Sequence, residues 1–356
     1  MRHFIFILML LSAALTSRAD EVLIEAEQMT NKGGWVTDQQ FMDLMGSPYL
    51  MAHGLGVPVA DASTFFQTRT SGTYRLFVRT YNWTAPWTSK PGPGKFRVAV
   101  DKTYTSQPVG DRGEGWQWVD LGTLRLKSGR HRLVLHDLTG FNGRCDALYL
   151  TTGTTRPQSV DDGSCGLWRR RLMGKTAVEK RSFDFVVVGG GIAGMCAAVA
   201  AARQGCKVAL VNDRPVLGGN NSSEVRVHLG GIIETGIYQR LGRMIREFGH
   251  RQGGNAMPAS YYEDSRKDSF IAAEPNITCF AGWRAVGVDQ QGQHLSSVTI
   301  YEVTTGREIS LEAPLFSDCT GDGTIGALAG ADCRMGREGR SEFNESYAPE
   351  KPDSLV

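Results

Sequence analysis

One stretch, residues 183–219, constrains the fold of this chain more than any other. It begins with a β-branched and aromatic run at residues 185–188, which is typical of a strand buried on both faces. Three glycines with the spacing G-x-G-x-x-G follow at once, and they are Gly189, Gly191 and Gly194. An alanine-rich helix and a second apolar strand at residues 207–211 come next. This order predicts a parallel βαβ unit that binds a dinucleotide.

Each glycine of the motif has a physical role in such a site. Gly189 allows the tight turn, Gly191 lets the backbone approach a pyrophosphate, and Gly194 lets the helix pack close to the strand. The N–H groups that begin the helix then face the phosphates. A glycine-rich turn without a ligand is the alternative, and the agreement of strand, turn, helix and second strand disfavours it. The acid that usually ends the second strand is displaced, because Asn212 stands there and Asp213 follows, so Asp213 is the candidate for ribose binding.

Two segments carry a resemblance to a known family. Residues 184–231, including Arg-Pro-Val-Leu-Gly-Gly-Asn at 214–220, resemble FAD-dependent oxidoreductases with a glutathione-reductase-type Rossmann domain. Among these oxidoreductases, the chain most resembles the subgroup related to the large subunit of heterodisulfide reductase. Residues 316–323 resemble the family's strand that ends in a Thr-Gly-Asp motif near the flavin, with an ordinary Gly-Asp turn as the alternative. The resemblance spans roughly residues 183 to 340 and implies FAD as the cofactor.

The resemblance also implies which residues contact FAD. Carried over position by position, they are Gly189, Gly191, Gly194, Asp213, Arg214, Gly218, Gly219, Asn220, Thr320, Gly321 and Asp322. A dehydrogenase that binds NAD is a further alternative, but it would more simply use an acid at position 212.

Two departures from the family narrow the chemistry. Disulfide reductases of this fold place a cysteine pair after the first FAD segment, whereas residues 220–223 are Asn-Asn-Ser-Ser. Thiol–disulfide exchange is therefore disfavoured. The seven cysteines contain no C-x-x-C run, so the sequence has no recognisable iron–sulfur ligand motif.

Residues 224–229 alternate charged and apolar side chains, which predicts a strand with Glu224, Arg226 and His228 on one face. Because the preceding glycines adjoin the cofactor, that face is expected to look toward the flavin ring. There Arg226 can stabilise a reduced flavin anion and His228 can relay a proton. Arg226 and His228 are thus the catalytic candidates, and an ordinary amphipathic strand with a solvated face is the alternative.

The rest of this half is predicted to form a packing helix over residues 237–248 and a β-meander over residues 276–316. Relatives of this kind continue into a large region that completes the substrate pocket. The domain at residues 183–356 is therefore expected to be incomplete at its C-terminal end, or the chain to be an unusually short member.

The first 19 residues have the pattern of a secretory signal. Arg2 supplies a positive end, residues 4–15 are apolar, and Ser-Arg-Ala at 17–19 resembles a cleavage site. The apolar run is too short for a membrane span, which needs about 20 residues. We therefore expect a periplasmic or secreted protein without a membrane span.

Charge and length set further limits. The chain has 39 Lys and Arg and 37 Asp and Glu, and removal of Arg2 and Arg18 with the signal leaves 37 of each. Nucleic acid and anionic membrane surfaces would favour a clustered basic excess, so neither is an expected partner. The mature length exceeds one typical core and predicts two domains.

The N-terminal half lacks helical periodicity. Short runs such as residues 74–79 and 96–100 alternate apolar and polar side chains, and turn-rich pieces separate them. This pattern predicts an all-β sandwich of jelly-roll type over residues 20–155, followed by a linker at residues 156–182.

The two ends of the predicted sandwich resemble the first and last strands of galactose-binding-like carbohydrate-binding modules, at residues 24–27 and 146–150. In those modules acidic residues often hold a structural calcium ion, which implies Glu25, Glu27 and Asp146 as ligands here. A solvated strand edge without metal is the alternative.

Five tryptophans of this half are candidates for stacking on sugars, and they are Trp35, Trp83, Trp87, Trp116 and Trp118. Burial in the sandwich core is the alternative for most of them. Trp83 and Trp87 lie in a loop-like stretch and are the better candidates.

The sequence therefore predicts a multidomain chain, with an all-β jelly-roll sandwich followed by an α/β Rossmann-type FAD-binding domain. Its expected activity is hydride transfer between flavin and a sugar- or glycan-related small molecule, in a secreted FAD-dependent oxidoreductase. The alternative is a polysaccharide-binding or polysaccharide-degrading protein in which the Rossmann part is not catalytic.

Overall fold

The computed structural model describes residues 19–158, 164–174, 178–249 and 253–354. The predicted signal sequence, residues 1–19, lies outside these ranges except for Ala19. The chain divides into two compact units. The first holds the residues up to Asp38 together with Pro48–Gly174, and the second holds Gln39–Ser47 and the residues from Lys175 onward.

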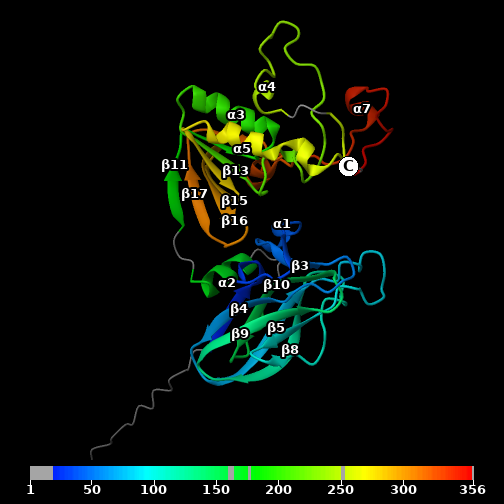
Figure 1. Ribbon diagram of the computed structural model, residues 1–356, viewed down its shortest axis with the longest axis vertical. Coiled ribbons are helices and arrows are strands. Elements are labelled where there is room, and N and C mark those ends of the chain that lie inside the picture. The colour runs from blue at the N-terminus through cyan, green and yellow to red at the C-terminus, as the bar shows by residue number, and fades with distance from the viewer. Residues whose placement is uncertain (1–18, 159–163, 175–177, 250–252, 355–356) are drawn as a thin grey trace, which may run out of the picture. The chain divides into compact units, whose positions relative to one another are not determined.

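The first unit is built on two antiparallel sheets (Figure 1). One contains β1 (Glu21–Glu25), β2 (Val36–Asp38), β3 (Tyr49–His53), β5 (Gly72–Thr80), β8 (Gln117–Leu126) and β10 (Phe141–Thr151). The other contains β4 (Ala62–Thr68), β6 (Phe96–Val100), β7 (Thr103–Tyr104) and β9 (Gly129–Asp137). Their inner faces supply one hydrophobic core, to which Leu76, Val78, Leu133 and Leu135 belong. The predicted β-sandwich is confirmed.

The outer face of β5 is also buried, which simple alternation does not predict. Phe77 and Arg79 point away from the core of the sandwich and yet are 2% and 0% exposed. A helix, α2 (Ser164–Leu172), explains the burial of Phe77, because its Trp168 packs in a cluster with Phe77 and Tyr149. The stretch predicted as a linker thus contains α2 and also β11 (Glu179–Ser182).

The second unit is built around a four-stranded parallel sheet in the order β14-β13-β12-β18. The strands are β12 (Phe185–Val188), β13 (Val208–Asn212), β14 (Ile277–Ala281) and β18 (Phe316–Asp318). Helix α3 (Ile192–Arg203) connects β12 to β13, as the glycine motif predicts. The Rossmann-type fold of this half is confirmed.

Different layers cover the two faces of this sheet (Figure 1). Val187 and Leu210 pack against α3 and α5 (Asp264–Ala272) on one face. Val186 and Val211 pack on the other face against a second sheet. That sheet has the order β11-β17-β16-β15, with β15 (Trp283–Gln291), β16 (His294–Glu302) and β17 (Glu308–Glu312). Strands buried on both faces explain the continuous apolar runs in the sequence.

Two local predictions are wrong. The helix expected over residues 237–248 is reduced to α4 (Ile245–Phe248), and Ile237 and Leu241 are 88% and 71% exposed. Residues 224–229 form no strand. The meander is confirmed in part, because β15, β16 and β17 pair antiparallel while β14 and β18 join the parallel sheet.

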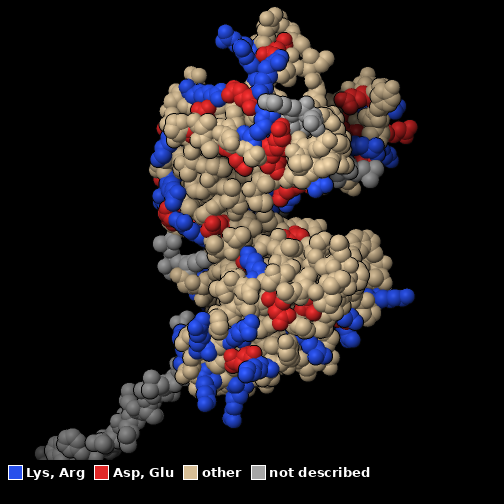
Figure 2. Space-filling model, in the orientation of Figure 1, with Lys and Arg blue, Asp and Glu red and all other residues tan. Residues whose placement is uncertain are grey.

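The remaining elements are short. They are η1 (Ala26–Gln28), α1 (Met42–Met45), η2 (Gly219–Asn221), η3 (Ala259–Tyr262), α6 (Thr324–Leu328) and α7 (Arg340–Phe343). Within the described ranges, none of the helices has the length and apolar character needed to cross a membrane. On the face drawn in Figure 2, both units carry side chains of both charges.

Candidate functional site

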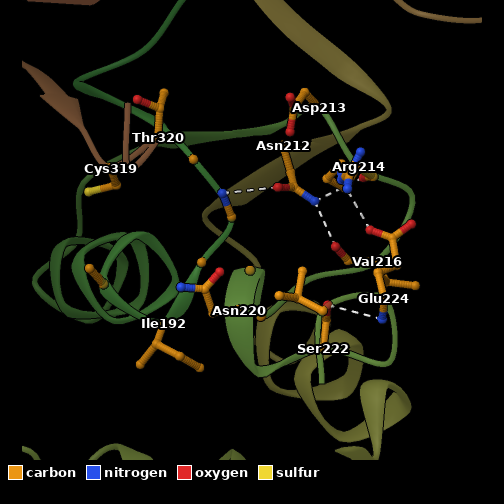
Figure 3. Close-up of a pocket in the computed structure, with 18 of the residues that line it drawn as sticks. Ile192, Asn212, Asp213, Arg214, Val216, Asn220, Ser222, Glu224, Cys319 and Thr320 are labelled. Atoms are coloured by element: carbon orange, nitrogen blue, oxygen red, sulfur yellow. Dashed lines mark hydrogen bonds and ion pairs between the residues drawn. The ribbon is translucent and has the colours of Figure 1, made fainter. Parts of the chain in front are cut away.

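A cavity of about 740 Å³ opens in the second unit where the strands of the parallel sheet end. It lies beyond the carboxyl ends of β12, β13 and β18, and its lining includes Gly189, Asn212 and Cys319 (Figure 3). This edge is where open α/β sheets bind their ligands, because the loops that leave the strands there turn to opposite sides.

The glycine turn after β12 is fixed by close contacts between backbones. A Cβ on Gly189 would lie 2.1 Å from the carbonyl oxygen of Cys319, and a Cβ on Gly194 would lie 1.8 Å from that of Gly189. Gly189 also has φ +109, which other residues rarely adopt. Gly189 and Gly194 are therefore required by the fold itself.

Gly191 differs from the other two glycines. The nearest atom to a Cβ at this position is the Gly219 Cα, at 3.9 Å, so a side chain would meet no steric barrier. Both Gly191 and Gly219 line the cavity. The bare backbone at Gly191 therefore keeps the cavity open rather than holding the fold together.

Helix α3 begins at the same place, with Gly191 as its N-cap. Its first turn contains no acidic residue, and no side chain in the described part of the chain caps it. Ile192 and Ala193 line the cavity, so the N–H groups that begin the helix are available to an anion there. The positive end of a twelve-residue helix stabilises a bound pyrophosphate. The turn and the helix therefore fit the diphosphate of FAD.

The second glycine pair lies directly against the first motif. The Gly218 N–H donates to the Gly190 carbonyl at 2.8 Å, and Gly191 and Gly218 form a parallel bridge. Gly218 has φ +111, and a Cβ there would lie 2.5 Å from the Asn221 carbonyl oxygen. The two glycine segments thus form one continuous wall of backbone.

Asn212 joins these segments through its side-chain amide. Its Oδ1 accepts from the Gly190 N–H at 3.1 Å, and its Nδ2 donates to the carbonyls of Arg214 and Val216, both at 2.9 Å (Figure 3). The residue is only 5% exposed. A carboxylate cannot donate these two bonds, which explains why an amide stands where relatives of this fold have an acid.

Every predicted cofactor-binding residue except Gly194 lines the cavity. Asp213, the candidate for ribose binding, lies 3.8 Å from the guanidinium of Arg284. Arg214 forms an ion pair with Glu224 at 3.2 Å. Arg284 lies on β15, about 70 residues further along the chain, and no sequence motif marks it as part of this site.

Asp318 fixes the turn that contains the Thr-Gly-Asp motif. Its carboxylate accepts from the N–H and hydroxyl of Thr320 and from the backbone N–H groups of Ile325 and Gly326. Burial alone would raise the pKa of Asp318, but these hydrogen bonds hold it below its usual value. Thr320, Gly321 and Asp322 are thereby held at the cavity. The sequence analysis missed Asp318, although an acid just before the motif was the available signal.

The two catalytic candidates are in different environments. The expected strand is absent from residues 224–229, and Arg226 has φ +63, so the side chains do not alternate there. Arg226 is not among the described residues that line the cavity, and its Nε donates to the Ser223 carbonyl at 2.9 Å. His228 lines the cavity, and its Nδ1 lies 2.7 Å from the Asn255 Oδ1.

Comparison with known proteins finds that each half of the chain matches a family model. Residues 184–353 match the model of the FAD dependent oxidoreductase family. Residues 22–142 match the model of the Golvesin C-terminal domain. A search of the curated proteins gave no match.

Several solved structures are similar to parts of the chain. The Podospora anserina GH26-CBM35 beta-(1,4)-mannanase is 15% identical with a TM-score of 0.31, over 55% of this chain and 51% of that chain, so this chain spans about half of its length. A family 35 carbohydrate binding module from Clostridium thermocellum is 15% identical with a TM-score of 0.30, over 36% and 96%. A geranylgeranyl bacteriochlorophyll reductase-like protein from Thermoplasma acidophilum is 18% identical with a TM-score of 0.28, over 43% of each chain.

The open position at Gly191 leads to a first prediction. Gly191→Asp should weaken FAD binding at least ~100-fold, because it puts a like charge against the phosphates without disturbing the backbone. Flavin absorbance of the protein after reconstitution and gel filtration measures the occupancy. Gly115→Asp is the matched control, since a Cβ at Gly115 meets no atom within 4 Å and Gly115 does not line the cavity. Full flavin occupancy in Gly191→Asp would refute this assignment of the pyrophosphate site.

The role of Asn212 leads to a second prediction. Asn212→Asp keeps the shape of the side chain but cannot donate to the two carbonyls, each lost bond costing about 0.5–1.5 kcal/mol. We expect weaker FAD binding and a lower melting temperature, measured by flavin titration and thermal unfolding. Tighter FAD binding in Asn212→Asp would instead mean that position 212 contacts the ribose, contrary to the geometry described.

Proposed function

We propose that this chain, an FAD-dependent oxidoreductase whose N-terminal unit is a carbohydrate-binding-module-like sandwich, acts on a sugar- or glycan-related substrate after export. The observation that carries the proposal is that one chain combines a cavity suited to FAD with a sandwich that presents exposed aromatic rings. The signal-like pattern of residues 1–19 supports export. Within the family we place the chain near the subgroup related to heterodisulfide reductase, as a member without its thiol chemistry.

The residues for FAD binding follow from the geometry of the cavity. Gly191, Gly219 and the start of α3 would hold the pyrophosphate, and Asp213 would contact a ribose. When bound, FAD would supply the hydride acceptor. An alcohol substrate that gave up its C–H hydride would also have to lose its hydroxyl proton to a base of the protein, which would leave a carbonyl.

His228 is our candidate for that base. The Asn255 Oδ1 accepts from the His228 backbone N–H at 2.9 Å. This hydrogen bond fixes the orientation of the Asn255 side-chain amide, with its oxygen toward His228. The His228 Nδ1, at 2.7 Å from the same oxygen, must therefore carry a proton. In the neutral ring this leaves Nε2 as the proton acceptor. His228 thus combines a place on the cavity with the tautomer that a base requires.

The sandwich offers Trp83 and Trp87 as a platform for a glycan. Trp87 is 77% exposed, and its ring centre lies 6.3 Å from that of Trp83. The Trp83 Nε1 donates to the Phe141 carbonyl at 3.0 Å. In the same loop, the Thr84 hydroxyl donates to the Oδ1 of the buried Asn82 at 2.9 Å. The exposed ring of Trp87 suits stacking on the apolar face of a sugar.

The other tryptophans of this half have partners inside the fold. Trp35 is 3% exposed and belongs to the sandwich core. Trp116 stacks on Tyr81, and Trp118 packs against Trp168. Trp83 and Trp87 are therefore the better candidates for the platform, as the sequence predicts.

Flavin reduction tests the activity, and this is the third prediction. FAD-loaded protein is mixed without oxygen with a panel of mono- and oligosaccharides, and bleaching of the flavin absorbance identifies a substrate. His228→Ala should slow that reduction ~10²–10⁴-fold while FAD remains bound. Arg226→Ala, two residues away and not on the cavity, is the matched control and should reduce at the parent rate. Equal rates in the parent and His228→Ala would exclude His228 as the base.

Glycan binding gives the fourth prediction. On a glycan array, Trp87→Ala should lose about 1–3 kcal/mol of binding free energy, estimated from stacking on exposed aromatic rings. Trp116→Phe, which keeps an aromatic ring beside Tyr81, serves as the control. Unchanged binding in Trp87→Ala would remove these rings from the glycan site. Glycan binding by a protein that never retains flavin would favour the alternative, a binding protein with a non-catalytic Rossmann part.

A further inference from the structure

The three carboxylates predicted to hold calcium lie together at the end of the sandwich core. Glu25 ends β1, Glu27 lies in η1, and Asp146 lies on β10, which pairs with β1. Glu27 and Asp146 are 0% exposed and Glu25 is 4% exposed. Buried carboxylates are unstable unless a positive group neutralises them.

Two guanidinium groups reach this cluster from neighbouring elements. Arg79 on β5 lies with its Nη1 3.1 Å from the Asp146 Oδ2. Arg169 on α2 bonds to the same oxygen, and its Nη1 lies 3.4 Å from the Glu25 Oε2. Arg79 is 0% exposed and Arg169 is 5% exposed. Both arginines are therefore part of the interior.

This arrangement does not suit a calcium ion. Ca²⁺ takes six to eight oxygen ligands, and a guanidinium beside those oxygens would repel it. In the described part of the chain, no group of three or more His, Cys, Asp or Glu side chains is placed to hold a metal. The carboxylates expected from the resemblance are present, but arginines contact them.

The charges of the cluster can balance without a metal. Three carboxylates face two guanidinium groups, and the ammonium of Lys32 is a third positive group that interacts electrostatically with Glu27. Burial, and then the neighbouring Glu25 and Asp146, raise the pKa of Glu27 well above its usual value, although Arg169 opposes the shift. Burial and like charge therefore both disfavour the ionised form of Glu27 in this cluster.

The adjacent residue of α2 holds the helix in place. Trp168 is 5% exposed, and its ring centre lies 5.1 Å from that of Tyr149 and 6.1 Å from that of Trp118. Consecutive residues thus bind α2 to the sandwich in two ways, Trp168 by apolar packing and Arg169 by charge. The packing of Trp168 orients the helix so that Arg169 enters the cluster.

We infer that Arg169 takes the place of a structural calcium ion in this sandwich. Its guanidinium joins the first and last strands through Glu25 and Asp146, which is the connection that a bridging metal would make. Because α2 supplies it, the sandwich is independent of calcium, and the segment that follows the sandwich is part of its folded structure.

The fifth prediction tests this inference on the full chain by thermal unfolding in EGTA and in excess Ca²⁺. Tryptophan fluorescence reports mainly on the first unit, because Trp283 is the one tryptophan of the sequence outside it. The unaltered protein should melt at the same temperature in both conditions. Arg169→Ala should melt roughly 5–15 °C lower in EGTA, because it removes the buried guanidinium that joins Glu25 to Asp146. Ca²⁺ should restore part of that loss by binding the oxygens that Arg169 contacts, although Arg79 still faces Asp146.

Arg171→Ala is the matched control, since Arg171 is exposed on the same helix, and it should behave like the unaltered protein in both conditions. Adding Glu25→Gln to Arg169→Ala should abolish the rescue by Ca²⁺. A melting temperature of the unaltered protein that rises with Ca²⁺ would overturn the inference, as would equal melting of Arg169→Ala and Arg171→Ala. If Arg169→Ala does not fold in either condition, the Ca²⁺ titration of the unaltered protein decides.

Discussion

The candidate site depends on three hydrogen bonds made by one buried amide. Asn212 accepts from the first glycine turn and donates to two carbonyls of the second glycine segment. Without these bonds, the buried Gly190 N–H would lose its acceptor, and the two glycine segments would lose their side-chain link. With them, the backbones of Gly191 and Gly219 lie close together without side chains between them, and the first residues of α3 line the cavity. The chemistry of the site thus rests on backbone geometry.

In the sandwich, buried polar groups are stabilised by ion pairs between carboxylates and arginines. The first and last strands of the domain bring three carboxylates together in its interior, where uncompensated charge is costly. Arg79 comes from within the sandwich and Arg169 from the helix that follows it. The bridging group is therefore covalently part of the chain, so its presence does not vary with the metal content of the surroundings.

Neither unit owes its proposed role to its fold alone. Parallel sheets with a glycine turn and antiparallel sandwiches both serve many functions. The arguments for hydride transfer and for glycan binding rest on particular groups, namely His228 with the proton position fixed by Asn255, and the exposed ring of Trp87 beside Trp83. The proposed function, exported flavin chemistry on a carbohydrate, would give these groups a common purpose in one chain.

The sequence by itself determined the order of the two folds and most of the cofactor cavity, because glycine spacing and strand periodicity are local properties of the chain. Gly189, Gly191 and Gly194 lie in one short segment, and their spacing alone indicates the strand, turn and helix of that segment. Only the tertiary structure decided where Arg226, Arg284 and Arg169 go. Arg226 has a left-handed backbone conformation, which an alternating sequence pattern does not predict. Arg284 lies on a strand distant in sequence and contacts Asp213. Arg169 contacts Asp146 because the packing of Trp168 holds helix α2 in place. These placements depend on packing between elements far apart in sequence. The composition of the chain and the spacing of its residues do not indicate which distant elements pack together.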